Sequence, residues 1–277
     1  MDFRTAAIIP VAGQSTRMGA FKPLIELDGE PLIRRTVRSA LAGGAREVRV
    51  VLGREVDRVR AALADMPDVV FVENPLYAST DMFRSVQMAM RDVGVADARM
   101  LRDAILGRAK GPLECLRTRL AGHEPDALFI LPGDVPAVAP STFEALAQRA
   151  ADPLSPPLLR PLYQGGHGHP LLVRREAYPA ILTFEASIGS AGGADDDSGA
   201  GAGGASGAAG ASGAGGADGR GATAGGGATA GGGLKAALAG FVLEGIEVAD
   251  EGVLLDADTP ADLTRLKEYL TALESRG

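Results

Sequence analysis

The segment from Val11 to Lys22 combines the chemical groups that bind phosphate. It holds two glycines, two hydroxyl residues and two cations, namely Gly13, Gly19, Ser15, Thr16, Arg17 and Lys22. Glycines let a backbone approach its ligand closely, and consecutive N–H groups in such a bend can form an anion-binding nest. A forked guanidinium beside a compact ammonium suits a polyphosphate. The segment therefore predicts a triphosphate site, with an ordinary strand-to-helix loop carrying two solvated cations as the alternative.

Two further segments carry carboxylates that could hold a divalent cation. Asp134 follows a glycine just past a predicted buried strand. Asp256 and Asp258 lie two residues apart, so an extended backbone would present both on one side. Mg²⁺ usually takes one or two carboxylates together with substrate oxygens, so these three residues are the predicted ligands of Mg²⁺ or Mn²⁺. Two alternatives stay open, because Asp134 could satisfy its own turn and Asp258 could cap a helix.

A third segment, Gly165–Pro170, places His167 and His169 on either side of a glycine. Two histidines could ligate a metal, but no nearby cysteine or further histidine completes a structural site. We expect a hairpin that faces the substrate, with a plain surface turn as the alternative. The sequence contains no Gly-x-Ser-x-Gly motif and no Cys/His dyad that would indicate a covalent nucleophile.

Short apolar runs alternating with helical patterns must position these residues. Buried strands are expected at 5–12, 48–52, 69–72 and 127–131, and helices at about 31–42, 55–64, 79–91 and from a capping box at Ser141–Glu144. Further strands are expected at 158–162, 170–173, 241–248 and 253–255, and helices at 96–121, 175–182, 234–238 and from Thr259 onward. The alternation predicts an α/β fold with a mostly parallel sheet, whose carboxyl edge is where such sheets bind ligands.

Composition limits the domain organisation and the partners. The stretch 189–233 holds 20 of the chain's 38 glycines and no aromatic or large aliphatic residue. Such a stretch cannot offset its ordering entropy, so we predict one domain over residues 1–277 with a disordered insert at 189–233. The net charge of −7 argues against nucleic-acid binding. A single cysteine, Cys115, argues against disulfides, and the absence of long apolar runs argues against membrane spans. The first segment has the pattern of a strand rather than a signal peptide, so we expect a cytoplasmic location.

Taken together and in this order, these motifs resemble the MobA-like nucleotidyltransferases, which have a three-layer, Rossmann-like nucleotide-diphospho-sugar transferase fold. The molybdenum cofactor cytidylyltransferases are the branch with the greatest resemblance. The matching segments are Ala12–Gly19 with Lys22, Asn74–Pro75, Met82–Val86, Leu131–Pro136, Gly168–Pro170, Gly232–Leu234 and Asp256–Pro260. The chain departs from the family in the length of its segment 96–121 and in its glycine-rich insert.

The resemblance implies transfer of a nucleoside monophosphate from a triphosphate to a phosphate-bearing acceptor, with release of pyrophosphate. Phe21 stands where guanylyl-transferring relatives usually have aspartate, which favours CTP, with molybdopterin as the acceptor. The implied nucleotide-binding residues are Val11, Ala12, Gly13, Ser15, Arg17, Lys22, Asn74 and Ser85. Arg17, Lys22 and Asp134 would be catalytic, and His169 would face the acceptor. Two alternatives stay open: a sugar-phosphate or other small-acceptor nucleotidyltransferase, and a nucleotide-binding regulatory protein without turnover.

Overall fold

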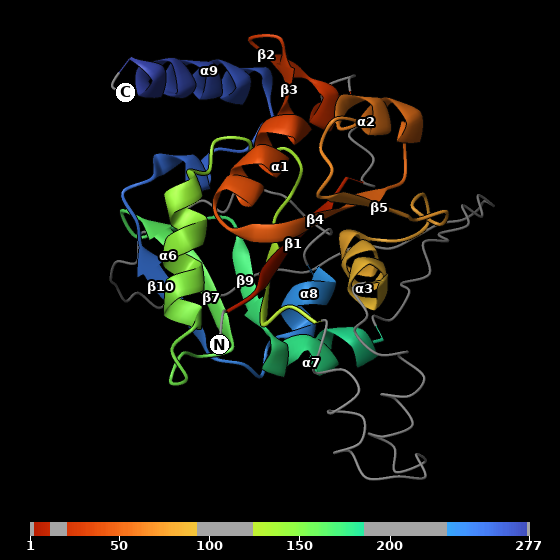
Figure 1. Ribbon diagram of the computed structural model, residues 1–277, viewed down its shortest axis with the longest axis vertical. Helices are drawn as coiled ribbons and strands as arrows, with labels where there is room; N and C mark the ends of the chain where they lie inside the picture. The colour runs from red at the N-terminus through yellow and green to blue at the C-terminus, as the bar shows by residue number, and fades with distance from the viewer. Residues whose placement is uncertain (1–2, 12–20, 93–123, 186–231, 276–277) are drawn as a thin grey trace, which may run out of the picture. The chain divides into compact units, whose positions relative to one another are not determined.

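The apolar runs of the described residues form one eight-stranded sheet (Figure 1). Its strands are β1 (Thr5–Pro10), β4 (Ala45–Leu52), β5 (Val69–Glu73), β6 (Ala127–Ile130), β7 (Leu158–Tyr163), β8 (Gly166–His167), β9 (Leu171–Arg174) and β10 (Leu243–Glu247). The strand order is β10-β7-β9-β6-β1-β4-β5, with β8 paired to β7. Strand β1 pairs in parallel with β4 and β6, β4 with β5, and β7 with β10, whereas β9 runs antiparallel between β6 and β7. The predicted mostly parallel sheet is confirmed.

The computed structural model describes residues 3–11, 21–92, 124–185 and 232–275. Apart from Glu185, these residues belong to one unit formed by Met1–Phe184 and Thr229–Gly277. The predicted helix at 96–121 lies outside the described residues, as does nearly all of the stretch 189–233. No described helix combines the length and the apolar character needed to cross a membrane.

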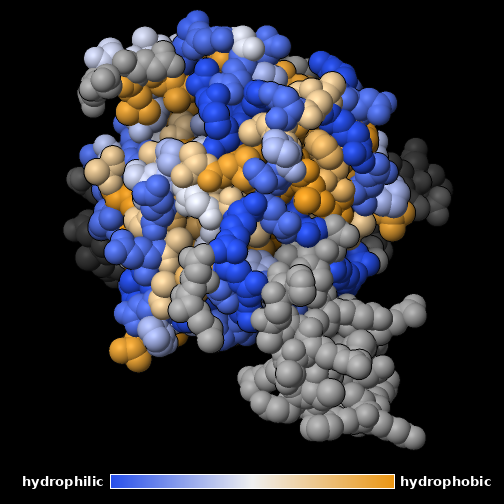
Figure 2. Space-filling view, viewed as in Figure 1, coloured by the Kyte–Doolittle hydropathy of each residue, from blue (hydrophilic) through white to orange (hydrophobic). Residues whose placement is uncertain are grey.

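Helices cover both faces of the sheet and give the predicted three-layer architecture (Figure 1). One face carries α1 (Leu32–Ala42), α2 (Val56–Ala62) and α6 (Pro140–Ala150), and the other carries α3 (Met82–Asp92), α7 (Tyr178–Thr183) and α8 (Gly232–Ala237). The last helix, α9 (Pro260–Glu274), packs against the small hairpin of β2 (Glu26–Leu27) and β3 (Glu30–Pro31). Figure 2 shows that hydrophilic residues cover most of the visible face, as expected where the apolar side of each helix faces the sheet.

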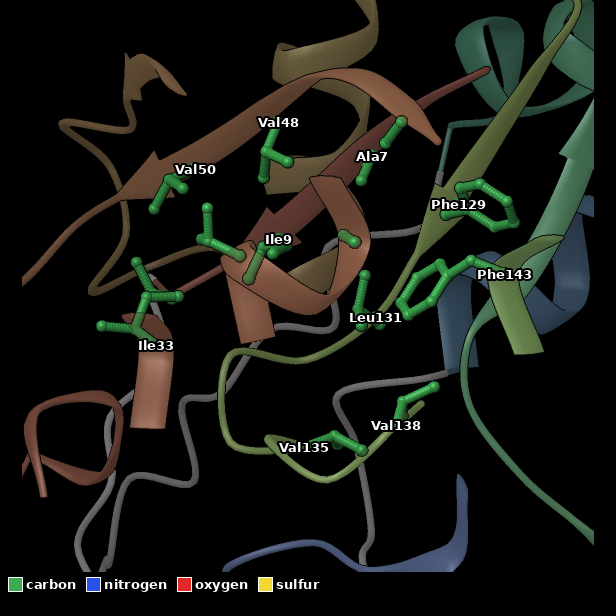
Figure 3. Packing of buried hydrophobic residues seen from close by; sticks show 14 of the residues in the cluster. Ala7, Ile9, Ile33, Val48, Val50, Phe129, Leu131, Val135, Val138 and Phe143 are labelled. Carbon is green, nitrogen blue, oxygen red and sulfur yellow. The ribbon is translucent and has the colours of Figure 1, made fainter. Parts of the chain in front are cut away.

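The apolar core continues beyond β6 into the loop that follows it (Figure 3). The rings of Phe129 on β6 and Phe143 on α6 meet edge to face with their centroids 5.0 Å apart. Leu131, Val135 and Val138, which follow β6, are almost completely buried in the same cluster. The loop between β6 and α6 is therefore anchored on both sides of Asp134, which gives that carboxylate a rigid support.

Three sequence-based predictions need correction. The prediction that a Ser141–Glu144 capping box opens the helix is wrong. Helix α6 begins at Pro140, and its N-cap residue Ala139 makes no side-chain capping hydrogen bond. In the predicted strand 253–255 only Leu255 has an extended backbone, since Glu251–Leu254 form a 3-10 helix. Gly232 and Gly233, which we assigned to the insert, open α8 instead. A Cβ on Gly233 would lie 2.8 Å from the Phe83 ring, so the glycine allows α8 to pack closely on α3.

Candidate functional site

The ends of β1 and β6 meet at the carboxyl edge of the sheet. Val11 continues β1 by donating its backbone N–H to the carbonyl of Val51 at 2.9 Å, and its side chain is buried. Gly133 packs directly on this side chain, because a Cβ there would lie 2.5 Å from Cγ1 of Val11. The contact brings the start of the predicted phosphate loop next to the segment that carries Asp134.

A third segment joins these two from the far end of the chain. The backbone N–H of Ala257 donates to the carbonyl oxygen of Asp134 at 3.0 Å. Ala257 is itself buried in a cluster with α9, so Asp256 and Asp258 are fixed on either side of it. The structure thus places all three predicted carboxylates at one edge of the sheet.

Lys22 lies between two of these carboxylates. Its Nζ is 3.5 Å from Oδ2 of Asp134 and donates a hydrogen bond to Oδ1 of Asp258. Lys22 opens a 3-10 turn over Lys22–Leu24, and the preceding Phe21 side chain is buried in the main core, which fixes its position. Asp134 and Asp258, which follow Lys22 by 112 and 236 positions in the sequence, therefore converge on its ammonium group. We call these three residues the Lys22 centre.

Burial and neighbouring charges shift the pKa of these groups. The pKa of Asp134 is raised, because burial disfavours its carboxylate more than the Lys22 ammonium stabilises it, and the charge of Asp258 adds to the rise. The pKa of Asp256 is raised by burial and by the charges of Asp258 and Asp134. Burial acts against the charge of Lys22, but the hydrogen bond to Asp258 and the charge of Asp134 outweigh it and raise the pKa of Lys22.

The donor set fits a divalent cation held by one or two carboxylates. Among the described residues, no group of three or more His, Cys, Asp or Glu side chains is arranged to hold a metal ion. Asp134 and Asp258 nevertheless share one cation, the Lys22 ammonium, and Mg²⁺ commonly takes only one or two carboxylates and completes its shell with phosphate oxygens. Metal binding by Asp134, Asp256 and Asp258 therefore stays a prediction.

Asn74, directly after β5, and Ser85 on α3 come together, and the polar groups of Asn74 are used within this part of the chain. The side-chain N–H groups of Asn74 donate to the hydroxyl oxygens of Thr80 at 3.0 Å and Ser85 at 3.1 Å, and its Oδ1 accepts from the backbone N–H of Leu76. Both residues are almost completely buried. They fix the shape of the loop between β5 and α3. Their predicted role toward a nucleotide would therefore be to position this loop.

His169 follows β8 and is tied to the segment before Asp256. Its backbone N–H donates to the carbonyl of Val253 at 2.9 Å. Burial and the charge of Arg160 lower the pKa of His169 to about 4, so the imidazole is neutral near neutral pH. Its Nδ1 is buried and has no hydrogen-bond partner within the described part of the chain. The role of His169 toward an acceptor stays a prediction.

No sequence pattern indicates Asp250, a buried residue that supports two segments of the site. Its carboxylate accepts from the backbone N–H of Ala139 at 2.8 Å and from the hydroxyl of Thr142 at 2.7 Å, so it caps α6 from a distant part of the chain. It also accepts from the backbone N–H of Gly252 and the hydroxyl of Tyr269. Asp250 thereby connects the loop after Asp134 with the segment before Asp256.

Four predicted residues of the phosphate loop, Ala12, Gly13, Ser15 and Arg17, lie outside the described residues. The residues on either side of the loop are described, and both are buried: Val11 packs on Gly133, and Phe21 precedes Lys22. The loop therefore begins and ends beside the segment that carries Asp134. The roles of its own residues stay predictions.

Two known proteins have sequences similar to part of this chain. Bifunctional protein GlmU from Halorhodospira halophila is 31% identical over 159 residues, which is 53% of this chain and 27% of that protein. The 2-aminoethylphosphonate cytidylyltransferase from Lancefieldella rimae is 32% identical over 92 residues, covering 31% of this chain and 37% of that protein. The chain thus spans less than two fifths of the length of either relative.

Solved structures share the fold. A protein from Mycobacterium tuberculosis H37Rv superimposes with a TM-score of 0.57 at 18% identity, covering 96% of this chain and 98% of that chain. The same protein has been crystallised in complex with manganese, and that structure matches with a TM-score of 0.52 at 18% identity over the same shares of the two chains. A family model described as the MobA-like NTP transferase domain matches residues 7–195, which is more than half of the sequence. The match runs through β1, the loop after β6 and the β7–β9 hairpin, and on this ground the chain belongs to the MobA-like NTP transferase family.

Proposed function

We propose that this chain transfers a cytidylyl group from CTP to a phosphate-bearing acceptor and releases pyrophosphate. The observation that carries the proposal is the convergence of Lys22, Asp134 and Asp258 at the carboxyl edge of a parallel sheet. Ligands of such sheets bind at this edge. One ammonium group beside two carboxylates is suited to hold both a phosphate and the cation that accompanies it.

The proposed reaction needs no nucleophile from the protein. A phosphate oxygen of the acceptor forms a bond to the α-phosphorus of the nucleotide, and the bond from that phosphorus to the pyrophosphate oxygen breaks. Lys22 would stabilise the negative charge that grows on the departing pyrophosphate, together with Arg17 of the preceding loop. Bound Mg²⁺, held by Asp134 with Asp256 and Asp258, would supply further positive charge beside the phosphates. Catalysis then rests on positioning and charge neutralisation, and loss of one such group should cost on the order of 10²–10³ in rate.

Two observations support CTP and a phosphate-bearing acceptor. Phe21 precedes Lys22, as in the cytidylyl-transferring branch that the sequence resembles. A relative at 32% identity is named a 2-aminoethylphosphonate cytidylyltransferase. Molybdopterin is the acceptor favoured by the resemblance, and a phosphonate is the second candidate because of that relative.

The test is a pyrophosphate-release assay with CTP, GTP and UTP, each offered with molybdopterin, with 2-aminoethylphosphonate and with a sugar phosphate. We expect release with CTP and one acceptor, and near-complete loss in Asp134→Asn with an unchanged melting temperature. Asp65→Asn is the matched control, because Asp65 pairs with Arg34 on the exposed surface of the α1 side. Nucleotide binding without pyrophosphate release from any pair would overturn the proposal and favour a regulatory protein. Near-normal turnover of Asp134→Asn would refute the role given to that carboxylate.

A further inference from the structure

A cavity of about 460 Å³ lies between the edge strand β5 and helix α3. Pockets of roughly 300–1,000 Å³ are typical of small-molecule sites. Its apolar lining comes from Val72, Pro75, Leu76 and Met88, and its charged lining from two arginines of α3, Arg84 and Arg91. The remaining lining residue is Asn74, whose side chain is bonded to other groups of the loop between β5 and α3. The resemblance implies nucleotide contacts for Asn74 and Ser85, but it names no role for the side chains of Arg84 and Arg91.

The two arginines lie on one side of α3. They are seven residues apart, which is about two turns and roughly 10 Å along the helix axis. Arg84 donates to the side-chain carbonyl of Gln87 at 3.1 Å. Neither arginine forms an ion pair with a carboxylate of the described chain. Two like charges therefore face one cavity without a counter-charge from those residues.

One nitrogen of the Arg91 guanidinium could donate to a further hydrogen-bond partner. Its Nε is buried and lacks a hydrogen-bond partner among the described residues. Burial and the positive charge of Arg84 both lower the pKa of Arg91. A buried donor without a partner costs free energy, and a neighbouring like charge adds to that cost. An anion in the cavity would provide the hydrogen-bond acceptor and the counter-charge together.

The apolar side of the cavity defines the rest of the ligand. Leu76 is 60% exposed, and it lines the cavity together with Pro75 and Met88. A free inorganic anion would leave this surface uncovered. A ligand with a ring or alkyl part next to its anionic group would cover it and gain the corresponding hydrophobic free energy.

The cavity is separate from the Lys22 centre. Strand β5 is the last strand of the sheet, and β4 and β1 lie between it and β6, after which Asp134 follows. At the usual spacing, three strand intervals amount to about 14 Å. We propose that this cavity binds a small organic phosphate, with the phosphate between Arg84 and Arg91 and the apolar part on Leu76 and Met88.

Calorimetric titration of the full chain with phenyl phosphate and with inorganic phosphate tests the proposal. Phenyl phosphate carries a ring and a phosphate but no nucleobase and no triphosphate. We expect saturable binding of phenyl phosphate and weaker binding of inorganic phosphate. The double variant Arg84→Gln/Arg91→Gln should weaken phenyl phosphate at least tenfold, and Leu76→Ser should weaken phenyl phosphate by several-fold without affecting inorganic phosphate.

The control variant Arg54→Gln/Arg58→Gln removes the same charge from the exposed surface at α2 and should leave both affinities within twofold. Lys22→Ala should retain phenyl phosphate binding, because the cavity does not use the Lys22 centre. If the double variant does not fold, the exposed Arg84→Gln variant alone should weaken phenyl phosphate several-fold.

Three results would overturn the proposal. The first is no saturable binding by the wild-type chain. The second is equal weakening in the double variant and the Arg54→Gln/Arg58→Gln control, which would show a general effect of charge. The third is a parallel loss of CTP affinity in the double variant, since the arginines would then belong to the nucleotide site and the cavity would not be a separate site.

Discussion

Replacement of Asp250 by alanine should destabilise this fold more than any other loss of a single carboxylate that we consider. The Asp250 side chain is 5% exposed and accepts four hydrogen bonds. Two come from the start of α6, from the backbone N–H of its N-cap residue Ala139 at 2.8 Å and the hydroxyl of Thr142 at 2.7 Å. The others come from the backbone N–H of Gly252 at 2.9 Å and the hydroxyl of Tyr269 at 3.1 Å. Asp250→Ala would leave these four donors without their shared acceptor.

The expected size of the loss follows from these contacts. A hydrogen bond to a charged group contributes about 1.5–3 kcal/mol, but donors that share one acceptor do not add, and some will reach water once the side chain is gone. We therefore expect a loss of about 3–5 kcal/mol in the free energy of unfolding. Tyr269→Phe removes only one of the four donors and should cost about 1 kcal/mol.

Urea unfolding followed by circular dichroism measures both losses. Asp65→Ala is the control, because its carboxylate is exposed and its ion pair with Arg34 should leave the unfolding midpoint nearly unchanged. If Asp250→Ala cost no more than Tyr269→Phe, the four hydrogen bonds would not act as described, and the connection that we infer between α6 and the segment before Asp256 would be refuted.

Three further predictions follow from the same structure. Lys22→Met should lower turnover by about 10²–10³ in the pyrophosphate-release assay, because two carboxylates then face each other without their shared cation, and an unchanged rate would contradict this. The pKa of His169 is lowered to about 4, below its unfolded value of about 6.5, so the folded state resists a proton that the unfolded chain accepts. Stability should therefore fall by about 2 kcal/mol from about pH 7 to about pH 5, and His169→Gln should remove most of this loss in urea unfolding. Gly252→Ala should lower the melting temperature sharply, because its Cβ would overlap the carbonyl group of Ala137, and a melting temperature like that of the wild type would show that the loop can move aside.

The sequence predicted those parts of the fold that depend on local patterns. Strands such as β1 and β4 are short apolar runs, and α1 begins after Pro31 and ends at Gly43, where the prediction placed its end. The start of α9 was also predictable, because Thr259 and Asp262 form a reciprocal capping box within four residues. Each of these signals involves residues that are close together in the chain, so no knowledge of tertiary contacts is needed to interpret them.

Contacts between distant residues explain what the sequence could not predict. The Ser141–Glu144 pattern matches a capping box, yet the acceptor for the first turn of α6 is Asp250, more than 100 residues away. The 3-10 helix at Glu251–Leu254 follows from the same residue, because Asp250 accepts from the backbone N–H of Gly252. No spacing rule identifies an acidic residue that caps a helix in another part of the chain.

The pairing of Lys22 with two carboxylates has a consequence for charge that neither motif shows alone. Two carboxylates and one ammonium leave a formal charge of −1, so the Lys22 centre attracts a cation rather than a free phosphate. Asp256, whose charge interacts with those of Asp134 and Asp258, brings this sum to −2, and a divalent cation would cancel it, which removes the repulsion of a triphosphate. The same groups could thus favour the metal and its nucleotide together over either one alone. This order of preference depends on Lys22 lying between Asp134 and Asp258, and therefore on the contacts of Gly133 with Val11 and of Ala257 with Asp134 that hold the three segments together.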